Sequence, residues 1–253
     1  MAEAERLEHG ETATPEGRRH NAASPAPVRP RDSATLILID WRGGEPFVLM
    51  GRRHARHAFM PGRFVFPGGR TDPSDSRITV ASDLHPAEAA RIAGSARDGR
   101  ARAARARARA IALSALRETY EEAGLLVGRK ADFATRSPQW QGFAKHGIQP
   151  ALDGLRYIAR AITPPGNVRR FDTRFLAARR DEVAVELPSP PTEELEGIAW
   201  LPITEALRLN VAAITRRVLE ELGKRLQRDP TLSPGEPVPF YFTRGGRFRR
   251  EML

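Results

Sequence analysis

The sequence predicts an α/β protein, a sandwich built over a mixed β-sheet. Short aliphatic runs bounded by glycine or proline indicate strands. A stretch without glycine or proline, residues 101–123, indicates a long helix. Strands and helices alternate along the chain in an irregular order, which favours a mixed sheet covered by helices.

The first strands are expected to form a hairpin. Ser33–Asp40 and Pro46–Met50 are aliphatic runs separated by the glycine-containing segment Trp41–Glu45. A third strand, Arg63–Phe66, is expected to stop at Pro67-Gly68-Gly69, because proline lacks an amide hydrogen and glycine tolerates positive φ. We therefore expect the chain to turn sharply at these two glycines.

Helices and strands then alternate to the C-terminus. A short helix is expected at Pro86–Ala93, and the long helix Ala101–Ala123 is expected to end at Gly124, since glycine is preferred just past a helix. The remaining elements are the strands Leu155–Ile162, Phe171–Ala178 and Leu195–Leu201 and the helices Ile203–Leu209 and Ala212–Leu226.

The chain is long enough for one domain with a sizeable core. It has 253 residues, and residues 1–32 lack the apolar segment of a secretory signal, so we predict a disordered tail followed by a domain over 33–253. No apolar run approaches the roughly 18 residues that a membrane span needs. The absence of cysteine excludes disulfides and thiolate zinc sites, and it fits a reducing cytoplasm.

The net charge of +10 favours anionic partners, among them nucleotides, nucleic acid and acidic lipid headgroups. Charge does not choose among these. The arginines of residues 100–109 are scattered around the predicted helix, so they are either a solvated face or a group that steers phosphates toward a nearby site.

The C-terminal part of the long helix carries a cluster of carboxylates. Glu118 lies three and four residues before Glu121 and Glu122, so all three share one side of the helix, while Leu113 and Leu116 form a separate stripe that can pack. Clustered carboxylates repel one another unless a counter-charge is present. A divalent cation resolves this repulsion; a solvated acidic face is the simpler alternative.

Oxygen ligands without cysteine or paired histidine suit Mg²⁺ or Mn²⁺. Mg²⁺ often uses a few carboxylates together with substrate phosphates, so the cluster predicts a phosphate-containing substrate that is attacked by an activated water. Arg117, one turn before Glu121, is placed to orient that carboxylate by a charge-assisted hydrogen bond.

This segment resembles a known motif. Arg117-Glu118-Thr119-Tyr120-Glu121-Glu122-Ala123-Gly124-Leu125 is similar to the second half of the Nudix box, and Phe66-Pro67-Gly68-Gly69 is similar to its usual entry. The resemblance implies a Nudix-like α/β/α sandwich and hydrolysis of a phosphoanhydride bond. It implies Glu118, Glu121 and Glu122 as metal ligands, Glu118, Arg117 and Glu121 as catalytic residues, and Gly69 as the residue that shapes the loop. Thr119 departs from the motif, which has an aliphatic residue there.

The first half of the motif is altered and displaced. Asp75 stands where the family has a glutamate after Gly69, and it precedes Arg117 by 117 − 75 = 42 positions instead of about eight. The difference predicts an insertion of about 34 residues, at about 76–109. Either the loop is expanded and Asp75 stays beside the helix, which we favour, or the first half of the motif is lost. The general base is left open between Glu118 and an acid on a later loop, Glu193 or Glu194; Asp75 is a further possible loop acid of the site.

The substrate is less clearly indicated. The segment 48–53, with Gly62 and Phe66-Pro67-Gly68-Gly69, loosely resembles the signature of coenzyme A diphosphohydrolases within the same family. The expected substrate is a nucleoside diphosphate derivative such as coenzyme A, ADP-ribose or NADH, bound by Arg53, Gly68, Gly69, Arg170 and Arg174. An impaired Nudix-fold protein that binds nucleotide or RNA is the alternative. Cleavage of modified RNA ranks lower, and a homodimer is left open.

Overall fold

The computed structural model describes residues 28–54, 56, 61–94 and 100–253. Residues 1–27 of the predicted tail lie outside this description. The first strand, β1 (Arg31–Arg42), begins two residues before the expected domain boundary at Ser33. Arg31 and Asp32 therefore belong to the folded domain and not to a tail.

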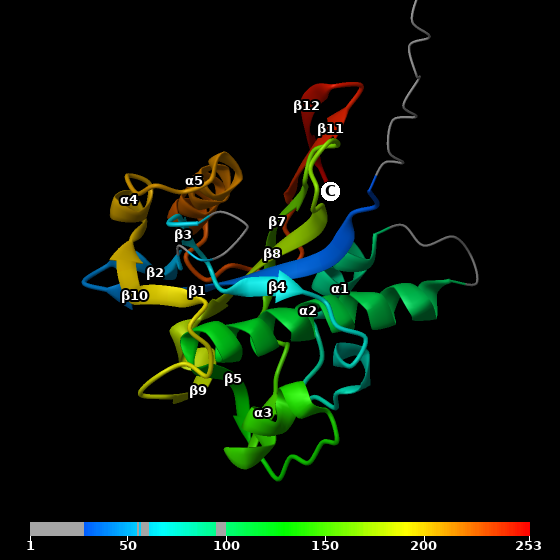
Figure 1. Ribbon diagram of the computed structural model, residues 1–253, viewed down its shortest axis with the longest axis vertical. Coiled ribbons are helices and arrows are strands. Elements are labelled where there is room, and N and C mark those ends of the chain that lie inside the picture. The colour runs from blue at the N-terminus through cyan, green and yellow to red at the C-terminus, as the bar shows by residue number, and fades with distance from the viewer. Residues whose placement is uncertain (1–27, 55, 57–60, 95–99) are drawn as a thin grey trace, which may run out of the picture.

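A nine-stranded mixed sheet forms the centre of the fold (Figure 1). β1 lies between β2 (Glu45–Arg53) and β8 (Phe171–Arg179), antiparallel to the first and parallel to the second. The short strands β3 (Phe64–Val65) and β4 (Gly68–Arg70) pair with β2 and β1. The other members are β7 (Arg156–Ile162), β10 (Leu195–Pro202), β11 (Pro239–Arg244) and β12 (Arg247–Met252).

Helices cover both faces of this sheet, so the architecture is an α/β/α sandwich. Leu36 and Leu38 of β1 pack toward α2 (Ala101–Ala123) and α1 (Pro86–Ala93), whereas Ile37 and Ile39 pack toward α4 (Ile203–Ala206) and α5 (Ala213–Arg228). Successive residues of a strand face opposite sides. The unbroken aliphatic run of β1 is thus explained by burial on both faces.

A smaller sheet lies beyond the C-terminal end of α2. It contains β6 (Ile148–Pro150), β5 (Leu125–Lys130) and β9 (Val183–Glu186), and α3 (Gln141–Lys145) packs against β6. The chain passes from α2 into β5 through Gly124, whose φ is 71° and whose N–H donates to the carbonyl of Tyr120. The glycine ends α2 as its position predicted.

Two local predictions differ from the structure. Gly68 and Gly69 were expected at a turn with positive φ, but both lie in the extended strand β4 and neither has positive φ. The helix expected over Ile203–Leu209 ends at Ala206. Pairing of β4 with β1 is a contact between distant segments, so local turn preferences could not reveal it.

The described residues of the expected insertion, 76–94 and 100–109, fold into the domain; residues 95–99 lie outside the description. The insertion's helix α1 packs on α2, and its buried Glu88 accepts backbone hydrogen bonds from Tyr157 and Gly235. The first turns of α2 are also anchored, because Arg107 pairs with Asp32 at the start of β1. Among the described residues, no helix is long and apolar enough to cross a membrane.

Candidate active site

The carboxylates of α2 lie on the side of the helix that meets β4. Leu113 and Leu116 are fully buried in the core, which turns Glu118, Glu121 and Glu122 toward the strand and a cavity beside it. Thr119, the departure from the motif, is buried as well and its hydroxyl donates to the carbonyl of Ala115 at 2.8 Å. A polar residue is therefore accommodated at this core position because its hydrogen bond is satisfied.

Arg117 is the centre of the hydrogen-bond network around these carboxylates. Its Nη1 donates to Glu118 and to Glu121, at 2.9 Å each, and its Nη2 donates to the carbonyl of Arg70 at 2.8 Å. Burial would lower the pKa of this guanidinium, but hydrogen bonding to Asp75 and the negative charges of Glu118, Asp75 and Glu121 raise it well above its usual value. Arg117 stays charged and holds two of the glutamates in place.

Asp75 completes the network from the other side. Its side chain is fully buried and accepts hydrogen bonds from Arg117 Nε and Trp140 Nε1, both at 3.0 Å, and from the backbone N–H of Asp72 at 2.8 Å. The structure thus places Asp75 against α2 despite the 42 positions between it and Arg117. Asp75 does not line the cavity. It is therefore placed to orient Arg117 and not to act on a substrate as a loop acid.

The two glycines of β4 allow the strand to approach α2 closely. A Cβ atom on Gly69 would lie 2.4 Å from the carboxyl carbon of Glu118, and one on Gly68 would lie 2.6 Å from the carbonyl oxygen of Ala34. The N–H of Gly68 donates to Glu122 Oε2 at 2.9 Å. Close approach, and not positive φ, is the reason for glycine at these positions.

The electrostatics of the cluster are those of crowded, partly desolvated acids. Burial, together with the charge of Glu121, raises the pKa of Glu118 to about 7 against the pull of Arg117. Burial, together with the charge of Glu118, raises the pKa of Glu122 to about 8 against the hydrogen bond from Gly68. Burial also raises the pKa of Glu121.

The donor chemistry of this cluster fits a divalent cation. Glu122 Oε1 is buried and has no hydrogen-bond partner among the described residues, and the nearest cation, Arg53 Nη2, is 3.7 Å away. Oxygen-only donors are those that Mg²⁺ and Mn²⁺ prefer. In the described part of the chain, no three acidic or histidine side chains already surround a common point. Arg117 holds Glu118 and Glu121, while Gly68 holds Glu122.

A cavity of about 1730 Å³ opens beside the cluster. Glu118, Glu121, Glu122 and Arg53 line one side of it, and Glu194 joins them from the loop before β10. Glu193 is exposed and does not line the cavity. Of the two neighbouring loop acids, Glu194 is therefore the one placed to act on a bound molecule.

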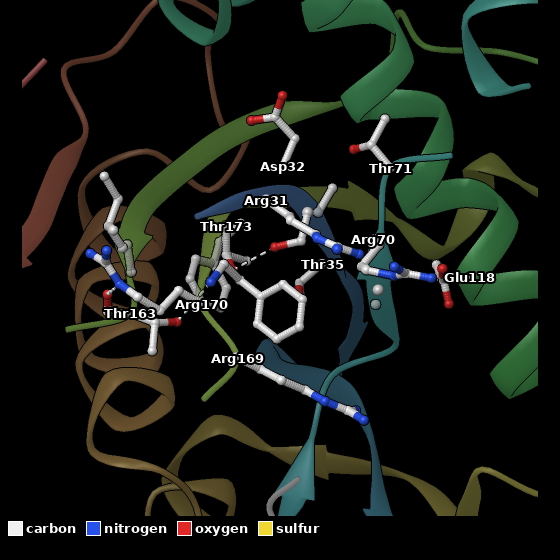
Figure 2. Close-up of a pocket in the computed structure, with 18 of the residues that line it drawn as sticks. Arg31, Asp32, Thr35, Arg70, Thr71, Glu118, Thr163, Arg169, Arg170 and Thr173 are labelled. Atoms are coloured by element: carbon white, nitrogen blue, oxygen red, sulfur yellow. Dashed lines mark hydrogen bonds between the residues drawn. The ribbon is translucent and has the colours of Figure 1, made fainter. Parts of the chain in front are cut away.

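The arginines expected to bind substrate have different surroundings. Arg170 lines the cavity, but its guanidinium donates to the carbonyls of Thr163 and Val28, so it also holds the turn between β7 and β8 (Figure 2). Arg174 does not line the cavity. Its side chain is only 1% exposed and pairs with Asp32 and Asp172 on the opposite face of β8. The structure thus places Arg174, which was expected to bind substrate, away from the cavity.

Several residues of the site were not predicted. Trp140, in η2 (Pro138–Trp140), donates to Asp75. Thr35 and Thr173 line the floor of the cavity, and Arg31 and Arg70 lie at its side (Figure 2). Strict two-residue alternation along β1 would have grouped Arg31 with Thr35. Because Arg31 was assigned to the predicted tail, this alternation was not applied to it.

No family profile matches the sequence. The structure is similar to that of a Nudix hydrolase from Alicyclobacillus acidocaldarius, with 25% identity and a TM-score of 0.59, covering 82% of this chain and 99% of that one. It also matches the Nudix domain of Shewanella oneidensis NrtR in complex with ADP-ribose, at 12% identity and a TM-score of 0.45, covering 83% and 94%. The fold of this chain is therefore that of the Nudix superfamily.

Proposed function

We propose that this chain is a Mg²⁺- or Mn²⁺-dependent hydrolase of a phosphoanhydride bond in a nucleoside diphosphate derivative such as coenzyme A, ADP-ribose or NADH. The observation that carries the proposal is the intact carboxylate cluster of Glu118, Glu121 and Glu122 on the wall of a large cavity, ordered by Arg117 and Asp75. A cation held there would supply positive charge to the phosphoryl oxygens and activate water.

The protein's own groups have separable tasks in this reaction. Glu118, Glu121 and Glu122 would hold the cation, and Arg117 fixes the first two of them. Water attack forms one bond to phosphorus and breaks the bond from phosphorus to the bridging oxygen, so both products carry phosphate. The water proton goes to a carboxylate that lines the cavity, either Glu118 or Glu194.

The alternative is an impaired Nudix-fold protein that binds nucleotide or RNA without cleaving it. That alternative would be favoured if the insertion separated Asp75 from α2, because the altered motif would then be incomplete. The contacts of Asp75 with Arg117 and Trp140 support the catalytic proposal instead.

The proposal is tested by incubating the purified chain with coenzyme A, ADP-ribose, NADH and dinucleoside polyphosphates, with Mg²⁺ or Mn²⁺, and identifying the products. We expect cleavage of at least one compound, and loss of at least about 100-fold in kcat for Glu121→Gln and Glu122→Gln. Glu220→Gln, on the exposed face of α5, is the matched helix control and should keep full activity. Tight nucleotide binding without hydrolysis of any compound would favour the impaired alternative.

The general base is separated from the metal ligands by a second pair of variants. If Glu194 is the base, Glu194→Gln should lower kcat by about 10² to 10⁴ with little change in the Mg²⁺ concentration that gives half-maximal activity. Glu193→Gln, one residue away but outside the cavity, is the control. Equal activity of both variants would assign the base to Glu118.

A further inference from the structure

Arg31 and Arg70 are two guanidinium groups at the cavity that the proposed reaction does not use. Both residues line the cavity, and no hydrogen bond or ion pair joins either side chain to another residue in the described part of the chain. Arg107, Arg117 and Arg174, in contrast, are each paired with a carboxylate. Arg29 and Arg169 also line this cavity without such a partner among the described residues, so Arg31 and Arg70 belong to a wider group of unpaired cations around it.

The strand register brings these two arginines to one place. β4 is antiparallel to β1, with Arg70 opposite Ser33, so Arg31 is the diagonal neighbour of Arg70 on the same face. Diagonal neighbours on paired strands have Cα atoms about 7–8 Å apart, which long side chains can bridge. Figure 2 shows both side chains on the same side of the cavity, between Thr173 and Glu118.

Two hydroxyl groups lie on the floor beside them. Ser33 and Thr173 are opposite each other in the parallel pair of β1 and β8, and their hydroxyl oxygens are 2.7 Å apart. Both residues line the cavity. One hydroxyl donates to the other, which leaves one hydroxyl hydrogen for a bound group, and each guanidinium carries five N–H donors, so this corner offers donors that suit an anion.

The acids next to these arginines in the chain have other partners: Asp32 pairs with Arg107 and Arg174, and Asp72 accepts a hydrogen bond from the N–H of Ser74. The charge of Arg70 makes a small contribution to the lowered pKa of Asp72, after the larger effect of hydrogen bonds from Ser74, but Arg70 forms no ion pair with it. Two like charges side by side repel each other unless an anion lies between them. A negatively charged group bound between the two arginines would relieve this repulsion.

This corner adjoins the carboxylate cluster, because Gly69, the residue before Arg70, lies against Glu118. Gly68 binds Glu122 through its N–H, and Arg70 lies two residues further along the extended strand, a separation of about 7 Å. A group held by Arg31 and Arg70 would therefore lie further along β4 than a group bound beside Glu122.

We propose that Arg31 and Arg70, with the hydroxyls of Ser33 and Thr173, bind a phosphate monoester of the substrate that is not cleaved. This inference rests on the proposed function and narrows it: the substrate is a nucleoside diphosphate derivative that carries a further phosphate outside the scissile diphosphate. The two arginines are specificity residues, and the carboxylate cluster acts on the anhydride.

Matched substrates that differ by one phosphate test this directly. The kcat/KM values are measured for NADPH against NADH and for coenzyme A against 3′-dephospho-coenzyme A, in the unaltered protein and in Arg31→Gln, Arg70→Gln and Arg102→Gln. Arg102 is exposed on α2 outside the cavity and controls for loss of charge. We expect a preference of about tenfold for the phosphate-bearing member of at least one pair, lost in the first two variants and kept in the third.

Other outcomes overturn the inference. Equal kcat/KM within both pairs would mean that no further phosphate is recognised. An equal loss for both members of a pair in Arg31→Gln would assign the arginines to the common diphosphate.

A binding measurement keeps this test separate from the proposed function. If no compound is hydrolysed, the proposed function fails, and calorimetric binding of adenosine 3′,5′-bisphosphate and adenosine 2′,5′-bisphosphate against AMP decides the subsite. Tighter binding of a bisphosphate that disappears in Arg31→Gln and Arg70→Gln supports the subsite. Equal binding of all three nucleotides refutes it.

Discussion

Asp75→Asn tests the contact that joins the displaced half of the motif to α2. The substitution keeps the size of the side chain, but it removes the charge and points an amide N–H₂ group toward Arg117 or Trp140. Asp75 is 0% exposed and Arg117 is 6% exposed, so the pair belongs to the buried class, in which loss of one partner costs about 3–5 kcal/mol. Because Arg117 keeps its hydrogen bonds to Glu118 and Glu121, we expect the lower end, about 3 kcal/mol.

The free energy of unfolding is measured by urea titration with linear extrapolation, and the midpoint temperature by calorimetry. A loss of about 3 kcal/mol corresponds to roughly 6–12 °C for a domain of this size. Trp140→Phe removes the indole hydrogen bond to Asp75 and also part of a fully buried ring, so it should cost at least about 1.5–3 kcal/mol. Its cost should be less than additive with that of Asp75→Asn, because both substitutions alter the same hydrogen bond.

Asp181→Asn is the control for this experiment. It removes a surface pair with Arg179 at 3.6 Å, in which the carboxylate is 70% exposed, and it should cost less than about 1 kcal/mol. If Asp75→Asn behaved like this surface control, the insertion would not fold Asp75 against Arg117 in solution, and our account of the site would be wrong.

Two further predictions follow from the close approach of β4 and from the ion pairs of β1. Gly69→Ala should lower kcat by about 100-fold or more, because its Cβ would displace the Glu118 carboxylate, while Gly223→Ala, whose added Cβ has no neighbour closer than 3.8 Å, should raise stability by about 0.5–1 kcal/mol. Equal activity of both variants would contradict the first. Although burial acts to raise the pKa of Asp32, its hydrogen bond from Arg107 and the nearby positive charges bring it below the ordinary 3.8. Stability from this pair is present above pH 3.8 and is lost as the pH falls through the lowered value. Acid unfolding of Asp32→Asn should therefore show a weaker pH dependence than that of the unaltered protein, and an unchanged dependence would exclude this role.

Local patterns were sufficient for most of the elements around the site. The limits of α2 follow from a stretch without glycine or proline and a final glycine, and α1 begins at a proline. β1 is buried on both faces, so its sequence is a continuous aliphatic run, and such a run predicts a strand. The strand β4 was missed because its two glycines carry no side-chain pattern, and only pairing with β1 makes them extended.

In the candidate site, too, some residues could be predicted from local spacing and others only from the folded structure. Glu118, Glu121 and Glu122 share one side of a helix, a relation set by spacing alone. Arg174 shows the limit of this reasoning: a strand covered on both sides does not reveal which of its faces meets a cavity. Arg170 and Arg174 looked equivalent in the sequence, yet one lines the cavity and the other is buried among Asp32 and Asp172.

The amino-acid order by itself determined the carboxylate helix, the glycine that ends it and the α/β class, because these depend on propensity and periodicity within a few residues. The tertiary structure decided whether Gly69 and Asp75 meet that helix and which arginines face the cavity. These are contacts between residues far apart in the chain, and they depend on strand register and on how the inserted segment packs. A buried charged group destabilises the fold unless it is paired. Only the folded chain places Asp75 in contact with both Arg117 and Trp140.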